Sequence, residues 1–353
     1  MTARIETAWQ RYRDLVGIDY PIVQDGMGPQ PTTKLAAAVC NAGGLGTVSS
    51  PSIVNTSERF LRERFRAAIE YVAEHTDRPF AVNVPVGRVA TGELLLVSET
   101  CIGEAIAAKR DGGKVGEQLV ALTTSAGYPG EFIGKIQAAG LLHQAKVGSV
   151  RHAMKARAAG TDVIIASGYE MGGHTHVNGV HTMVLAPQVI GQLDCPVVVS
   201  GGLCDGRGLA AMLAMGAAGI AMGTRFIATQ EHEWHARYKQ RVVDTPEWGD
   251  QVFQGVYAPC RGLKNPGLEK LPEALASKTP EEFQEWEEEE MRRAMREGDI
   301  ETGLLPGGQV AAALHDMPTV DELISRIVGE AAELLSAVAD SSIALTDRHR
   351  AAV

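Results

Sequence analysis

The sequence is poor in aromatic residues and cysteine, and it contains no long apolar run. Aromatic residues make up 5% of the chain, and the five cysteines lack the paired spacing of a disulfide framework or a zinc site. No window approaches the roughly 18 consecutive apolar residues that a membrane-spanning helix needs. The charged N-terminus lacks the apolar core of a secretory signal. These absences predict a reduced, cytoplasmic protein without a membrane partner.

Positive charge is also in short supply. The chain has 33 Lys and Arg against 43 Asp and Glu, which gives a net charge of −10. Nucleic acids and anionic membranes attract basic surfaces, so this charge argues against both as partners. Glycine is abundant, with 39 residues, and a chain of 353 residues can bury a large core.

Short apolar segments alternate with helical segments along most of the chain. The apolar segments do not alternate with polar residues, as expected for strands buried on both faces. The alternation predicts a parallel sheet, and eight such units close a (β/α)8 barrel. An open doubly wound sheet is the alternative, although no GxGxxG motif follows the first strand. The expected strands cover residues 21–24, 44–48, 80–83, 119–122, 141–144, 162–165, 196–199 and 219–221, and the expected helices cover 34–41, 56–75, 131–139, 149–159 and 206–215.

The pattern divides the chain into a barrel, residues 1–230, and a mostly helical C-terminal extension. Within the barrel, residues 84–117 exceed a usual βα loop and are expected to cover the barrel mouth. Residues 231–318 are helical, acidic and expected on the substrate side; their acidic run, 285–290, is typical of a solvated helix face. Residues 319–353 open with a capping box and carry one apolar face, which we expect to pack on the barrel or on the partner of a homodimer.

Glycine-rich turns follow the last two expected strands. One is Ser200-Gly-Gly202, and the other is Ala221-Met-Gly-Thr224. Glycines at strand ends let backbone N–H groups approach a ligand, and a helix just beyond adds a favourable dipole for phosphate. Barrels commonly bind phosphate at these turns. The pattern predicts a phosphate-bearing cofactor; the alternative is that these glycines serve tight turns alone.

A third glycine-rich segment, Ser167-Gly-Tyr-Glu-Met-Gly-Gly-His174, ends in a histidine. Imidazole titrates near neutral pH, so His174 can take a proton from a carbon acid or donate a hydrogen bond to a developing anion. The alternative is a histidine bonded only to its own loop. His176 and His181 follow, but no carboxylate or cysteine has matching spacing, so no metal site is predicted. We expect these two residues, with Tyr128, to shape the substrate pocket.

Five motifs, in order along the chain, resemble the nitronate monooxygenase family, formerly called 2-nitropropane dioxygenases. Flavin-dependent enoyl reductases and some NADH:quinone reductases are relatives of that family. The resemblance covers residues 19–230 and resumes near 261–265, 307–309 and the final helix. The motifs are Pro21-Ile-Val-Gln-Asp-Gly-Met27, residues 35–46, Gly168-x-Glu-x-Gly-Gly-His174, Ser200-Gly-Gly202 and Met222-Gly-Thr-Arg-Phe226.

The resemblance implies a barrel that holds FMN non-covalently at its mouth. On the family's pattern, Gly26 and Met27 lie along the flavin ring, Asn83 hydrogen-bonds it, and Ser167 stands where many members have Gln. His174 matches the catalytic base of nitroalkane oxidation, whereas His176 replaces a glycine of the usual motif. The other implied cofactor contacts are Gly172, Gly173, Gly202, Ala221, Met222, Gly223 and Thr224.

The implied activity is FMN-dependent oxidation of alkyl nitronates and nitroalkanes with O2. As an alternative, NAD(P)H reduces the flavin and the electrons pass to a quinone or to an enoyl- or CoA-type substrate, with His174 as proton donor. A third hypothesis is a flavin-binding protein without turnover. Lys146 ends the fifth expected strand and is a candidate for a positive charge near the flavin; the alternative is a solvated lysine.

Overall fold

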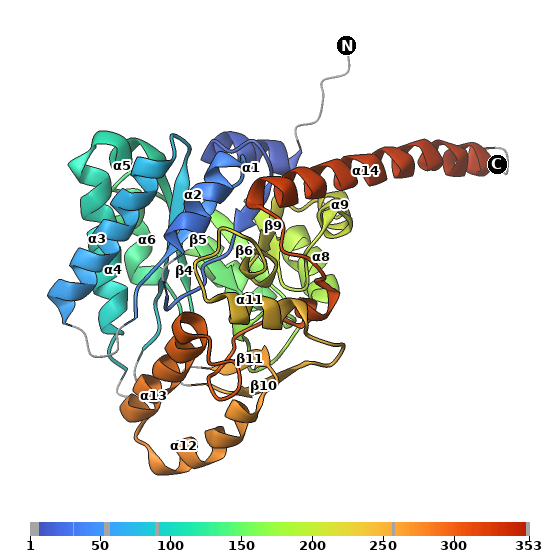
Figure 1. Cartoon of the computed structure of the whole chain (residues 1–353). Coiled ribbons are helices and arrows are strands. Elements are labelled where there is room, and N and C mark those ends of the chain that lie inside the picture. The colour runs from blue at the N-terminus through green and yellow to red at the C-terminus, as the bar shows by residue number, and fades with distance from the viewer. Residues whose placement is uncertain (1–6, 31, 53–56, 89–91, 256–257, 351–353) are drawn as a thin grey trace.

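A computed structural model shows an eight-stranded barrel surrounded by helices (Figure 1). It describes residues 7–30, 32–52, 57–88, 92–255 and 258–350, with side chains up to residue 341. The strands are parallel and neighbour one another in the order β1-β9-β8-β6-β5-β4-β3-β2. A parallel bridge between Val23 and Leu45 closes the ring. The closed ring confirms the predicted (β/α)8 barrel and excludes the open sheet.

The expected strands and helices all overlap observed ones, although residue 56 of one expected helix lies outside the described residues. The strands are buried on both faces because helices cover the outside and side chains fill the interior. The barrel strands are β1 (Ile22–Gln24), β2 (Gly46–Ser49), β3 (Phe80–Pro85), β4 (Leu119–Ser125), β5 (Leu142–Val147), β6 (Val163–Ser167), β8 (Val197–Ser200) and β9 (Gly219–Met222). The helices are α1 (Ala8–Val16), α2 (Thr33–Asn41), α3 (Glu58–His75), α4 (Leu96–Asp111), α5 (Gly113–Gln118), α6 (Gly130–Gln137), α7 (Val150–Ala158), α8 (Thr182–Gln192), α9 (Gly206–Ala214) and α10 (Thr224–Ile227).

The segment between β3 and β4 is mainly an outer layer of the barrel. Helix α4 packs against α3, and its buried Cys101 and Ala105 join the core on that side. The expectation of a mouth cover is therefore wrong for residues 98–117. The segment reaches the central cavity only at its start, through Pro85, Leu95 and Val97, so far as the described residues show.

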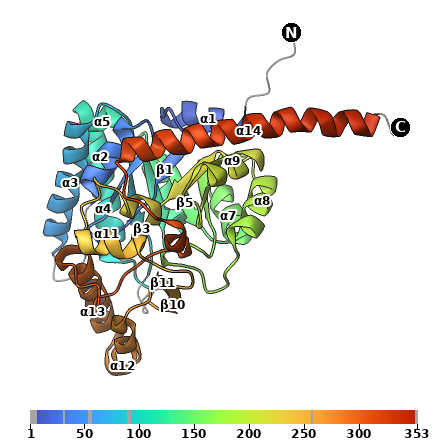
Figure 2. The ribbon, with the colours of Figure 1, turned by 45° about the vertical axis from the view of Figure 1, so that its right-hand side comes forward.

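Residues 231–318 form a cap of helices and a hairpin at one end of the barrel (Figures 1 and 2). The hairpin was not predicted: β10 (Asp250–Gln254) and β11 (Pro259–Leu263) pair antiparallel, and β11 also pairs with the short strand β7 (Gly173–His174). Helices α11 (Ala236–Val243), α12 (Leu271–Ser277) and α13 (Pro280–Arg292) surround the hairpin, and the π-helix η2 (Arg293–Glu297) continues α13.

The last helix, α14 (Val320–Arg350), begins at the predicted capping box, in which Thr319 and Glu322 exchange hydrogen bonds. Its first turns pack on α9 and α2, and both views show the rest extending beyond the barrel. The predicted apolar face is buried as far as Ala331, whereas Val338 is 63% exposed. Within the described part of the chain, no helix has the length and apolarity to cross a bilayer.

Candidate active site

A cavity of about 910 Å³ opens at the carboxyl ends of the barrel strands. All but one of the predicted cofactor residues line this cavity: Gly26, Met27, Asn83, Gly172, Gly173, Gly202, Ala221, Met222, Gly223 and Thr224. Ser167 does not line it. This residue ends β6 and is fully buried, and its Oγ has no hydrogen-bond partner among the described residues.

One side of the cavity consists of backbone from the turns after β8 and β9; we call Gly201, Gly202, Gly223 and Thr224 the main-chain wall. Gly201 and Gly202 have φ of 99° and 71°, which side chains with a Cβ rarely adopt. The Thr224 hydroxyl oxygen accepts the Gly308 N–H at 2.9 Å, so its own hydrogen can still be donated. Backbone amides and a hydroxyl suit a phosphate held in a fixed position.

The loop after β6 carries His174, and the hairpin fixes it in place. Strand β7 pairs with β11, and the Thr175 N–H donates to the Pro259 carbonyl at 2.7 Å. The buried Arg261 guanidinium donates to the Tyr169 carbonyl at 3.1 Å. The unpredicted hairpin is therefore the element that orients the histidine loop.

His174 faces a carboxyl group that the sequence analysis missed. Its Nε2 lies 3.8 Å from Oε2 of Glu287 on α13, and Glu287 is 1% exposed. Burial lowers the pKa of His174 to about 4, so the imidazole is neutral at pH 7 and able to accept a proton. A carboxylate at this distance favours the imidazolium once a proton has been accepted. The prediction of a solvated face for 285–290 is wrong at Glu287 and Glu290, which are both buried. Glu287 lies over the cavity, and Glu290 pairs with Lys270 and Arg293.

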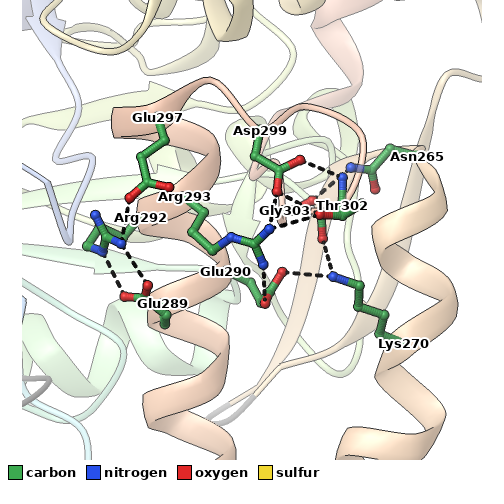
Figure 3. Close-up of polar contacts among 10 residues, drawn as sticks. All are labelled: Asn265, Lys270, Glu289, Glu290, Arg292, Arg293, Glu297, Asp299, Thr302 and Gly303. Carbon is green, nitrogen blue, oxygen red and sulfur yellow. Dashed lines mark hydrogen bonds and ion pairs between the residues drawn. The ribbon is translucent and has the colours of Figure 1, made fainter.

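Two groups of polar contacts lie at the carboxyl end of α13 (Figure 3). One joins Arg292 to Glu289 and Glu297, within α13 and η2. The other joins Arg293 to Glu290 and Asp299, Lys270 to Glu290, and Asn265 to the Gly303 carbonyl. Through Lys270 and Asp299, the second group ties the helix that presents Glu287 to the rest of the cap, and pairs that share residues restrain a helix more than one exposed pair does.

His176 also lines the cavity, and its ring lies against Gly148 at the end of β5. A Cβ built on Gly148 would overlap the His176 ring, so this ring occupies space that only glycine leaves open. The His176 Nε2 is buried without a hydrogen-bond partner among the described residues. Burial, with the charges of Lys146 and His152, lowers the pKa of His176 to about 4. The ring is therefore neutral at pH 7, with its Nε2 edge packed against Gly148.

The two remaining substrate candidates lie apart. Tyr128 lines the cavity, 47% exposed, with the Lys155 ammonium 3.8 Å from its ring centroid. His181 does not line it: its side chain is 57% exposed and its Nδ1 lies 3.3 Å from Glu170. In the described ranges, no three His, Cys, Asp or Glu side chains are placed to bind a metal.

A buried ion pair crosses the barrel at the floor of the cavity, which both of its residues line. Lys146 Nζ donates to Asp25 Oδ2 at 2.5 Å, and the Ser200 hydroxyl donates to the same oxygen at 2.9 Å. Since β1 and β5 lie four places apart in the sheet, the pair connects opposite sides of the ring. The alternative of a solvated Lys146 is wrong, because its side chain is 13% exposed.

Comparison with known proteins identifies the family of the chain. Residues 10–330 match the profile of the family described as nitronate monooxygenase. The chain belongs to this family. Membership confirms the resemblance in the motifs and makes the chain an oxidoreductase of the nitronate monooxygenase type, in a family of flavoproteins.

Three proteins similar to this chain differ in their activities. The (3aS,4S,5R,7aS)-5-hydroxy-7a-methyl-1-oxo-octahydro-1H-indene-4-carboxyl-CoA dehydrogenase of Rhodococcus jostii (strain RHA1) is 33% identical over 367 residues, covering 92% of this chain and 96% of the relative. A probable nitronate monooxygenase of Staphylococcus saprophyticus is 31% identical and covers 74% of this chain and 81% of its own. The solved structure of FabK from Thermotoga maritima has a TM-score of 0.80 at 31% identity, covering 96% of this chain and 99% of its own.

Proposed function

We propose that the protein is an FMN-dependent oxidoreductase that oxidises alkyl nitronates and nitroalkanes, with His174 as the proton-transfer residue. The observation that carries this proposal is that His174 and the main-chain wall line one cavity. The wall offers amides and the Thr224 hydroxyl to the single phosphate of FMN. Gly26, Met27 and Asn83 line the same cavity and are assigned to the flavin ring.

The chain's own residues then handle the proton. Bound FMN supplies two-electron redox chemistry. The neutral His174 accepts the α-proton of a nitroalkane, and the Glu287 carboxyl group, 3.8 Å away, stabilises the resulting imidazolium. A nitronate arrives without that proton, so His174 then serves as a hydrogen-bond donor to the anion.

A second candidate keeps the cavity and FMN but uses NAD(P)H as the reductant and a CoA-type compound as the substrate, with His174 as proton donor. Two observations favour it. The cavity is also lined by Arg151 and Lys155, which suit an anionic ligand larger than a nitronate. The carboxyl-CoA dehydrogenase of Rhodococcus jostii matches 92% of the chain.

The pigment and its reductant test the proposal. The purified protein should be yellow, and mass spectrometry should identify the released pigment as FMN. In anaerobic stopped-flow measurements, bleaching by ethylnitronate alone supports the first candidate, whereas rapid bleaching by NADH or NADPH supports the second. A colourless protein that does not take up FMN would contradict both.

A further inference from the structure

Glu170, in the loop after β6, places a carboxylate in the cavity beside the main-chain wall. Its side chain is 18% exposed and lines the cavity. A Cβ built on Gly202 would lie 3.4 Å from the Cβ of Glu170 and 3.8 Å from its carboxyl carbon, so the side chain lies directly against the turn after β8. Like charges repel, and a carboxylate with no other partner would weaken phosphate binding at this wall. The contacts of Glu170 show what it does there instead.

The carboxylate binds the first turn of α8. The Thr182 N–H donates to Glu170 Oε2 at 3.0 Å, and Thr182 is the first residue of that helix. The N-cap residue, His181, makes no capping hydrogen bond with its side chain, and its Nδ1 lies 3.3 Å from Glu170 Oε1. Glu170 therefore replaces the missing N-cap from another loop. The helix dipole favours a negative charge at this end, which offsets part of the repulsion toward a phosphate.

Through Thr182, the same carboxylate is connected to the main-chain wall. The Thr182 hydroxyl oxygen lies 3.0 Å from Glu170 Oε2 and 2.8 Å from the Gly201 carbonyl oxygen, so its hydrogen can be donated to either. Gly168 permits this approach, because a Cβ built on it would lie 2.0 Å from the Thr182 hydroxyl oxygen. The start of α8 and the turn at Gly201 are thus held together around one carboxylate.

The backbone of Glu170 supports the other turn of the wall. Its carbonyl accepts the N–H of Gln309 at 3.0 Å. The neighbouring Gly308 donates its N–H to the Thr224 hydroxyl at 2.9 Å. Glu170 is therefore connected to both turns, to the one after β8 by its side chain and to the one after β9 by its main chain.

We propose that Glu170 is a positioning residue for the phosphate of the cofactor, because its carboxylate fixes the turn at Gly201 and Gly202. The proposal rests on FMN as the cofactor of the proposed function and adds a residue to its binding site. His181, which was expected to shape the substrate pocket, supports the same helix start. The hydrogen bond to Thr182 carries the effect, so glutamine should replace Glu170 and alanine should not.

FMN and riboflavin differ only in the phosphate, so their two affinities separate the wall from the ring site. Both are measured by quenching of flavin fluorescence on the full-length protein freed of its flavin. Glu170→Ala should weaken FMN binding ~10-fold, because a hydrogen bond to a charged group is lost, and riboflavin binding less than about threefold. Glu170→Gln should stay within about threefold of wild type for both, since its carbonyl oxygen still accepts from Thr182 and the repulsion is removed.

Glu231→Ala is the matched control. The Glu231 carboxylate accepts the Val320 N–H at 3.0 Å, so it also binds the start of a helix from another loop, but it is outside the cavity lining. This variant should lose thermal stability as Glu170→Ala does, while its ratio of FMN to riboflavin affinity stays at the wild-type value. A shared loss of stability is thereby separated from an effect on the phosphate.

Hydrogen exchange gives a second measurement that needs no flavin. In Glu170→Ala, peptides that cover 182–185 and 199–204 should exchange several-fold faster than in the wild-type protein, because the helix start and the turn are no longer held together. Unchanged exchange there, a Glu170→Ala variant that binds FMN like wild type, or equal losses for FMN and riboflavin would each overturn the positioning role. A wild-type protein that binds neither flavin contradicts the proposed function itself, so the two failures are distinguishable.

Discussion

Two sides of the cavity use different chemistry. The main-chain wall presents backbone amides, two of them from glycines at positive φ. The second side, which we call the α7 wall, presents the long, exposed side chains of Arg151 and Lys155. Fixed amides lose little conformational freedom on binding, while Lys and Arg side chains must be ordered by their ligand. The first arrangement suits a resident cofactor, and the second suits a ligand that enters and leaves.

The loop after β6 lies between the two walls. The largest expected effect of a substitution is at His174, at the end of this loop. His174→Ala should lower the turnover of a neutral nitroalkane by about 10²–10⁴-fold, because the proton acceptor is lost. FMN content should stay at the wild-type level. Steady-state kinetics measures the effect, with His75→Gln on the exposed end of α3 as the control. Unchanged turnover would remove His174 from the mechanism.

Breaking the ion pair at the floor of the cavity should cost more stability than breaking an exposed pair. Lys146→Met leaves the buried Asp25 carboxylate without its cation, which should lower the free energy of unfolding by about 3 kcal/mol. The matched exposed pair is Arg78 with Asp19, where Arg78→Met should lower it by less than about 1 kcal/mol. Urea unfolding of both variants compares them, and equal losses would contradict a special role for the buried pair.

Glu287 tests whether the cap takes part in the chemistry between the walls. Glu287→Gln should lower kcat about 10-fold through the lost stabilisation of the imidazolium, with little change in KM. Glu287→Asp should recover part of the loss. A change confined to thermal stability would show that Glu287 only supports the packing of α13.

The pH dependence of activity tests the roles of His174 and Glu287 further. Because the pKa of His174 is lowered to about 4, its activity as a base should persist as pH falls from 8 to about 5 and decline near pH 4, rather than near the 6.5 of free imidazole. The carboxylate favours the protonated ring, so Glu287→Gln should move this decline to lower pH. A decline near pH 6.5 in the wild-type protein would contradict the assignment.

The smallest expected effect tests whether the main-chain wall binds FMN or only forms turns. Gly202→Ala places a Cβ at φ 71°, a conformation that disfavours alanine by about 1–2 kcal/mol, and should weaken FMN binding about fivefold. Gly134→Ala on α6 meets no atom within 4 Å and is the control. Titration with FMN measures both, and equal affinities would mean that the backbone of Gly202 is not needed.

The sequence predicts the barrel and the glycine turns because both depend on local patterns. Buried parallel strands are apolar throughout, and turns at strand ends require glycine. Glu287 could not be found in this way, since an acidic run has the same composition on a solvated helix as on one that covers a cavity. The hairpin of β10 and β11 was missed because Asp250–Gln254 and Pro259–Leu263 lack a clear apolar alternation.

The contact between Gly148 and the ring of His176 determines where that ring can lie. A side chain at position 148 would require the imidazole of His176 to rotate away from the end of β5. The shape of the cavity on this side therefore depends on a residue that contributes only backbone atoms to it.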